Sequence, residues 1–428
     1  MTAQVTDDLG NQTTSDAGRL VVSRWAWSFD GGSAVNGFSM SRAGWLVVPN
    51  TPSSNLTVIE TTGSPGGSVG TRRPPVRNVA LGSDTPELIF ALESNGAVSV
   101  GETYELPLLS QSIWAEGRAR ERIQTMGPLL AGKPGQDSVA AVFQSLGGLS
   151  AEWAVVANGG VLSTGQVAMG PVLARDAGTS PFGSSLGAVA AGSVITATDG
   201  VSFFSLAGTG TRSFGDLTAD PKALPLAAPF TEVSHLIGKA SGVAGSGLSN
   251  GMPRSFAAQL PGPFTPWDNA APGPIGAPVA TANALYFVRD GGLSSFVCRT
   301  TPVTGSTTCA TAAVNERASG LALGLNDTLY AVVSRTPANA TFLQVRTAST
   351  LALQYEIPLP GVTGACLSLT PTCIGGRPVI GCVDTVGRIV FVFTDARGID
   401  TAADWPMEGH DPAKTFNTAT ALIQYSCP

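Results

Sequence analysis

Six carboxylates lie near predicted turns, and two carboxylates sharing a pocket can cleave a glycosidic bond. They are Glu87, Glu93, Glu102, Asp199, Asp290 and Asp395. Cleavage requires two carboxyl groups roughly 5–9 Å apart, with separate roles as acid and as base or nucleophile. Two of the six precede a glycine, where aspartate commonly serves the turn itself. We therefore predict no catalytic residue and keep a glycan-active hydrolase as an alternative hypothesis.

Histidine is almost absent, which limits acid–base and metal chemistry. The two histidines, His235 and His410, lie in no Ser/His/Asp or metal-binding pattern. His410 belongs to the run WPMEGHDP at residues 405–412. We interpret this run as a compact loop in which Trp405 packs and polar groups satisfy the loop backbone. No metal site and no cofactor site is predicted.

The cysteines indicate disulfides. They are Cys298, Cys309, Cys366, Cys373, Cys382 and Cys427. Cys298 and Cys309 flank a turn-rich spacer, as Cys366 and Cys373 do, and a hairpin would place each pair face to face. Six cysteines allow 15 pairings, so the full connectivity stays open. An even count at such spacings predicts an oxidising compartment, with buried free thiols as the alternative.

A short hairpin recurs seven times along the chain. The copies begin at Gly44, Glu87, Glu152, Val194, Ala284, Thr328 and Pro378. Each has an apolar strand, a tight polar or Gly-containing turn and a returning strand. Repeats of roughly 40–50 residues match four-stranded blades, and the double-length gap after Val194 predicts a degenerate copy from Thr231. The fold class predicted is an all-β β-propeller of eight antiparallel four-stranded blades, or seven if that segment is an insertion.

Residues 1–24 differ from the repeats and form a predicted N-terminal strand segment, with the propeller covering residues 25–428. The segment resembles the last strands of a bacterial immunoglobulin-like repeat, through its V-x-D-x-x-G-N turn. That resemblance implies a longer, multidomain surface protein. The alternative is that these strands pair with the last blade and close the ring.

Two further segments carry a family resemblance. Gly276 to Phe296, with Asp290 and two glycines at its turn, resembles the repeats of quinoprotein-like (PQQ-like) propellers. The run from Asp404 to Pro412 is similar to the tail of secreted bacterial propellers of that type. Enzymes of the family bind a quinone and calcium, and use adjacent cysteines, a Trp floor and a catalytic Asp. This chain has no adjacent cysteines, so the resemblance implies the fold without the cofactor.

The charge and hydropathy of the chain limit the kinds of partner that it could bind. The 428 residues carry a net charge of −6, with only 24 Lys and Arg and no basic stripe, which argues against nucleic acid. No window approaches the ~18 apolar residues of a membrane helix, so no membrane insertion is predicted. We expect a non-catalytic binding, scaffold or adhesion module that contacts protein or glycan through its loop face. The expected location is extracellular or at a bacterial cell surface, or the periplasm.

Three alternatives remain open. A hydrolase would hold its carboxylates in the axial pocket of the propeller. A divergent quinoprotein would carry its cofactor there. A weakly charged, Gly-, Ser- and Thr-rich surface would also suit self-assembly into a larger complex, because such faces pack without a large desolvation cost.

Overall fold

The computed structural model describes the chain continuously over residues 274–301, 306–362, 364–395, 398–414 and 421–427. Elsewhere it describes the strands and a few flanking residues, with side chains given chiefly within 38–61. The described elements are β-strands, apart from the short 3₁₀ helix η2 (Ile423–Tyr425). No described helix is long and apolar enough to cross a membrane.

Most described strands pair in chain order into four-stranded antiparallel sheets. The first two sheets contain β4 (Ser39–Met40), β5 (Trp45–Asn50), β6 (Asn55–Glu60) and β7 (Pro65–Gly70), then β8 (Val76–Leu81), β9 (Leu88–Ser94), β10 (Ser99–Glu105) and β11 (Gln111–Arg118). The next two contain β12 (Ile123–Leu129), β13 (Ser138–Gln144), β14 (Ser150–Ala157) and β15 (Gly160–Ala168), then β16 (Gly187–Ala190), β17 (Ser193–Thr198), β18 (Ser202–Ala207) and β19 (Lys222–Pro225).

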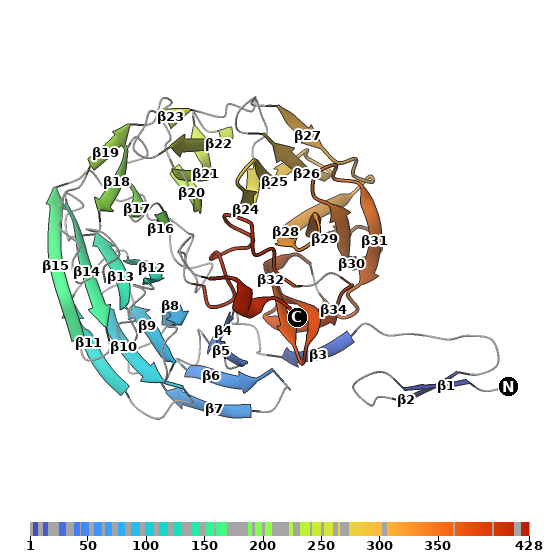
Figure 1. The fold of residues 1–428 in the computed structure, drawn as a ribbon, viewed down its shortest axis with the longest axis horizontal. Coiled ribbons are helices and arrows are strands. Elements are labelled where there is room, and N and C mark those ends of the chain that lie inside the picture. Colours follow the sequence, from blue (N-terminus) through green and yellow to red (C-terminus); the bar gives the residue numbers. More distant parts are fainter. Residues whose placement is uncertain are drawn as a thin grey trace.

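The second half of the chain continues this pattern. Its sheets contain β20 (Glu232–Lys239), β21 (Gly242–Ser249), β22 (Met252–Gln259) and β23 (Phe264–Thr265), then β24 (Pro274–Thr281), β25 (Ala284–Asp290), β26 (Ser295–Thr300) and β27 (Thr307–Cys309). The sheet after these contains β28 (Glu316–Gly324), β29 (Thr328–Arg335), β30 (Ala340–Thr347) and β31 (Leu353–Pro358). The sheets stand around a common centre as the blades of a propeller, with the first strand of each innermost (Figure 1).

The last sheet joins both ends of the chain. It contains β32 (Cys366–Ile374), β33 (Arg377–Asp384), β34 (Arg388–Phe393) and, as its outer strand, β3 (Trp25–Asp30). β3 runs antiparallel to β34, with Phe29 opposite Ile389. The closing strand thus begins at Trp25. Upstream of it, β1 (Ala3–Thr6) and β2 (Gln12–Ser15) pair with each other and lie beside the ring (Figure 1).

The repeated hairpins of the sequence are paired neighbouring strands, as predicted. Six copies are the second and third strands of a sheet, such as β29 with β30. The copy at Glu152 is β14 with β15, the third and fourth strands, which explains the uneven gap before it. The segment from Thr231 forms the sheet β20 to β23, as expected of a degenerate copy.

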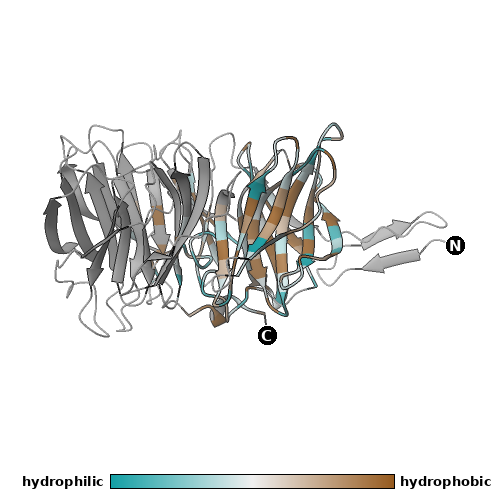
Figure 2. Cartoon of the chain, turned by 90° about the horizontal axis from the view of Figure 1, so that it is seen from above, coloured by the Kyte–Doolittle hydropathy of each residue, from teal (hydrophilic) through white to brown (hydrophobic). Residues whose placement is uncertain are grey.

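Apolar side chains fill the space between neighbouring sheets. Strand residues alternate between two faces, so β29 sends Leu329, Ala331 and Val333 toward the sheet of β25 and Tyr330 and Val332 to the other side. The strands of the described blades are correspondingly hydrophobic along their length (Figure 2). Where side chains are described, the core of the interface between blades is therefore hydrophobic, and each such blade is held by packing against its neighbours.

Three disulfides join all six cysteines and indicate an oxidising compartment. Cys298 bonds Cys309 across β26 and β27, as the hairpin predicts. The prediction that a hairpin places Cys366 and Cys373 face to face is wrong. Both lie on the single strand β32, about 23 Å apart at about 3.3 Å per residue.

The two cysteines on β32 instead bond to other segments. Cys366 bonds Cys382 on the next strand, β33. Cys373 bonds Cys427, near the end of the chain. The disulfide from Cys373 to Cys427 fastens the end of the chain to the inner strand β32.

We predict that the disulfide from Cys373 to Cys427 stabilises the fold more than the one from Cys298 to Cys309. The first spans 54 residues and the second 11. Loop-closure entropy then gives about 4 and about 3 kcal/mol. Paired Cys→Ser variants, compared by chemical denaturation, measure both. A larger loss at the short loop would contradict the assigned pairing.

Candidate functional site

The C-terminal segment, residues 398–414, lies across the centre of the ring, where Figure 1 shows the end of the chain in red. Backbone bonds tie it to the last residues of four inner strands, β4, β8, β24 and β28. In each bond, an N–H group of the strand donates to a carbonyl oxygen of the segment. The bonds are Met40 to Pro412 (2.7 Å), Leu81 to Ala413 (3.4 Å), Ala280 to Trp405 (2.8 Å) and Leu323 to Pro406 (2.7 Å). The segment therefore links blades that are far apart in sequence.

The run WPMEGHDP is buried within this segment. Trp405 is fully buried among Ala280, Leu285 and Phe287, which confirms that it packs. The His410 ring meets Trp405 edge-on at 5.2 Å between centroids, and its Nδ1 lies 3.2 Å from an Asp411 carboxylate oxygen. The structure thus gives His410 a packing role in a compact loop.

A buried lysine anchors the same segment. Lys414 is fully buried, and its Nζ donates to Ser368 Oγ of β32 and to the Glu408 carbonyl, both at 2.9 Å. Burial lowers the pKa of Lys414, while the carboxylates of Glu408 and Asp411 act in the opposite direction. Burial likewise raises the pKa of Glu408, and Lys414 opposes that rise. These charges balance one another inside the ring.

The axial residues do not fit a quinone with calcium. Trp405 has no exposed face to serve as a floor, because its side chain is fully buried among its neighbours. Asp411 is also fully buried and lies beside His410. All six cysteines are in disulfides between non-adjacent positions. Within the part of the chain that the structure describes, no group of three or more His, Cys, Asp or Glu side chains could hold a metal ion.

Of the six carboxylates considered from the sequence, the structure describes Glu87, Asp290 and Asp395 and places them apart. Glu87 accepts the Arg42 N–H at 2.7 Å, just before β9. Asp290 Oδ1 accepts the Gly292 N–H at 3.0 Å, which confirms its turn role. Asp395 follows β34, so these three belong to three different sheets. The side chains of Glu93, Glu102, Asp199 and His235 lie outside the described residues.

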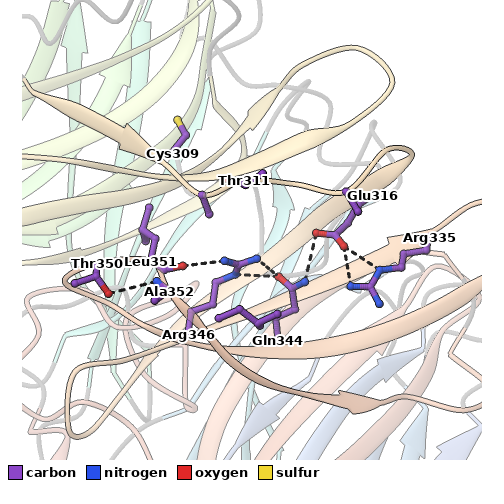
Figure 3. Close-up of a pocket in the computed structure, with 12 residues that line it drawn as sticks. Cys309, Thr311, Glu316, Arg335, Gln344, Arg346, Thr350, Leu351 and Ala352 are labelled. Carbon is purple, nitrogen blue, oxygen red and sulfur yellow. Dashed lines mark hydrogen bonds and ion pairs between the residues drawn. The ribbon is translucent and has the colours of Figure 1, made fainter.

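A polar cleft of about 460 Å³ opens between two neighbouring blades. One wall comes from β27 and the residues after it, and the other from the outer part of the sheet β28 to β31 (Figure 3). Apolar residues fill the inner part of this interface. β27 is only three residues long, and the cleft lies beside it. The residues used below are Thr311, Ala313, Glu316, Arg335, Gln344, Arg346 and Thr350–Leu353.

Two carboxylates, Glu316 of the cleft lining and Glu356 outside it, share one arginine. Arg335 Nε donates to Glu316 Oε2 at 2.9 Å, and its two Nη atoms donate to both oxygens of Glu356. The Arg335 guanidinium also stacks 4.6 Å from the centre of the Phe342 ring. Such a forked, stacked arginine is held in one geometry.

Gln344 links this group to a second arginine. Its Nε2 donates to Glu356 Oε1 at 2.8 Å and to Glu316 Oε1 at 3.3 Å. Its Oε1 accepts from Arg346 Nε at 2.9 Å and Nη2 at 2.7 Å. Arg346 is 5% exposed and also donates to the Leu351 carbonyl at 2.8 Å. In Figure 3 the Arg346 guanidinium lies between Leu351 and Gln344, with Glu316 and Arg335 beyond.

The electrostatics of the cleft favour binding over proton transfer. Burial would raise the pKa of Glu356, but hydrogen bonds from Arg335 and Gln344 outweigh it and lower the pKa below the ordinary value. A general acid needs a raised pKa, so Glu356 is a poor proton donor near neutral pH. Burial lowers the pKa of Arg346, opposed by Glu316 and Glu356. The cleft is a fixed array of paired charges.

Sequence reasoning missed this cluster because its members come from four strands. The available signal is alternation: Gln344 and Arg346 are polar positions two apart in the otherwise apolar strand β30. Hairpin register supplies the rest, placing Glu316 opposite Arg335 and Glu356 opposite Gln344. An offset of one residue would turn each of these side chains to the other face.

No protein-family model and no curated protein matches the chain. Among solved structures, the dihydro-heme d1 dehydrogenase NirN in complex with DHE matches 85% of this chain and 75% of its own, at 14% identity and a TM-score of 0.50. The match to virginiamycin B lyase from Staphylococcus aureus covers 86% of this chain and 98% of the lyase, at 11% identity and a TM-score of 0.43. The match to the propeller domain of the Trilobed protease from Pyrococcus furiosus covers 75% of this chain and 95% of that domain, at 8% identity and a TM-score of 0.44. At 14% identity, the match to NirN supports the fold alone.

Replacing Trp405 by alanine is expected to lower the free energy of unfolding by about 3–5 kcal/mol, because it empties a fully buried site. Denaturant titration measures the loss. Ile423→Ala is the control in the same C-terminal region, since Ile423 is 68% exposed and should change stability by less than about 0.5 kcal/mol. Equal effects of the two variants would contradict the buried position of the segment.

Glu356→Gln tests the lowered pKa of that carboxyl group. Because folding lowers this pKa, the stabilisation is complete above the ordinary glutamate pKa of about 4.3 and disappears as the pH falls through the folded-state value. We expect the variant to be less stable than the native chain by about 1–2 kcal/mol near neutral pH. The difference should shrink below about pH 4. Denaturant unfolding curves of both proteins, recorded from neutral pH to below about pH 4, measure this difference in stability. A difference that does not change with pH would contradict the lowered pKa of Glu356.

Proposed function

We propose that the chain is an extracellular or cell-surface β-propeller of a bacterium, with eight blades, that acts as a non-catalytic binding module. The eight described sheets of four strands each and the pairing of β3 with β34 support a closed ring of this size. The three disulfides support life outside the cytoplasm. The PQQ-like and immunoglobulin-like resemblances remain predictions consistent with this proposal.

The observation that carries the proposal is the charge pairing in the cleft between the blades. Glu316 and Glu356 are both bonded to Arg335, and the pKa of Glu356 is lowered, so Glu356 is not poised for acid catalysis. The centre of the ring, where a propeller hydrolase would hold its carboxylates, is crossed by the C-terminal segment. Pre-organised polar groups in an open cleft suit recognition of a ligand.

A hydrolase is the second candidate function, favoured by one observation. Gln344 Nε2 donates to both Glu316 and Glu356, so a second carboxylate lies close to the one that lines the cleft. Release of Arg335 on substrate binding would be needed to free either carboxyl group. The experiment below therefore measures retention and turnover together.

Native protein with intact disulfides is applied to an array of extracellular glycans and cell-envelope proteins, and is also incubated with 4-nitrophenyl glycosides. We expect retention on the array with no release of nitrophenol. Release that Glu316→Gln abolishes would establish the hydrolase instead. Absence of both retention and turnover would contradict the binding function.

A further inference from the structure

We propose that the cleft between β27 and the sheet β28 to β31 binds a neutral saccharide, an inference that rests on the proposed binding function. The cleft volume of about 460 Å³ falls within the range of about 300–1,000 Å³ common for small-ligand sites. Its walls come from two different blades, so the ring itself holds them in place.

The charge balance of the cleft favours an uncharged ligand. Arg335, Arg346 and Glu316 line the cleft, and Glu356, outside the lining, bonds Arg335 through both of its oxygens. The four side chains together therefore carry no net charge. A carboxylate or phosphate ligand would lie close to Glu316, and an ammonium would lie close to both arginines. Either charge would enter a site already neutral, whereas a polyol brings no net charge and no such repulsion.

The cleft offers both unused hydrogen-bond donors and unused hydrogen-bond acceptors. A guanidinium has five N–H donors, and Arg346 commits three of them, two to Gln344 Oε1 and one to the Leu351 carbonyl. Glu316 Oε1 accepts only the long 3.3 Å bond from Gln344. The Thr350 hydroxyl accepts from the Ala352 N–H at 3.3 Å, which leaves its own proton available.

Sugar hydroxyls match this arrangement because each one both donates and accepts. One hydroxyl can accept from the spare Arg346 N–H groups while another donates to Glu316 Oε1. Planar guanidinium and carboxylate groups present paired atoms that suit two neighbouring hydroxyls. Leu353, which is 47% exposed, adds apolar surface for the C–H face of a sugar ring.

The test uses saturation-transfer NMR with named probes on the intact protein. The neutral probes are the methyl glycosides of glucose, galactose, mannose and N-acetylglucosamine. The charged probes are methyl glucuronide and glucosamine, and N-acetyl-trialanine amide represents a peptide. We expect at least one neutral glycoside to bind at least tenfold more tightly than either charged probe and than the peptide.

Two exposed positions separate the cleft from the rest of the surface. Ala352→Trp fills the mouth of the cleft without touching the buried network and should abolish binding. Ala402→Trp is the matched control, since Ala402 is exposed and lies outside the cleft lining, and should leave binding unchanged. Thr350→Val removes the hydroxyl at an exposed position and should weaken binding severalfold.

The outcomes are distinct from those of the array experiment. Tighter binding of a charged probe or of the peptide would overturn the saccharide assignment. Glycoside binding, or retention on the array, that survives Ala352→Trp would overturn the cleft as the site while the binding function stands. Failure of every probe, with retention on the array, would also overturn the saccharide proposal alone. Failure of both experiments would remove the binding function as well.

Discussion

A ring of sheets is stable only if its first and last blades meet, and here one antiparallel pairing makes that contact. β3, from the N-terminal part of the chain, completes the sheet of β32 to β34, with Phe29 opposite Ile389. An open ring would expose the backbone groups of unpaired strand edges. Apolar packing extends from this sheet into the first blade, where Phe38 meets Phe391 at 5.5 Å between ring centroids. The geometry of every interface between blades follows from that closure.

The C-terminal segment adds a second constraint from inside the ring. Its carbonyl groups accept hydrogen bonds from the ends of four inner strands. Farther along the chain, the disulfide from Cys373 to Cys427 fastens the end of the chain to a fifth inner strand, β32. The buried Lys414 ammonium donates to the Glu408 carbonyl and Ser368 Oγ, and the nearby carboxylates of Glu408 and Asp411 oppose the effect of burial on its pKa. This segment crosses the centre of the ring, and the proposed ligand site lies instead between two blades. The cleft at Arg346 lies there because the short strand β27 does not cover the outer part of its neighbour.

Local pattern predicted the strands and hairpins, because alternation and turn residues act over a few positions. That was enough for the hairpin at Thr328, for the degenerate copy from Thr231 and for the disulfide from Cys298 to Cys309. It failed where partners are set by the fold. Cys366 and Cys373 look like the ends of a hairpin in sequence, yet they share one strand. The cleft was also beyond reach, because Glu316, Arg335 and Gln344 converge only through the register of three strands, and the facing wall comes from another blade.

The central claim is that the C-terminal segment holds the inner strands of a closed ring together. Hydrogen–deuterium exchange on the native protein tests it most directly, at the amides of Met40, Ala280 and Leu323, whose acceptors lie in that segment, and at Trp405 itself. The account predicts that these amides exchange as slowly as those of the buried strand β33. Exchange as fast as that of the exposed turn at Leu293, which is 77% exposed, would contradict it.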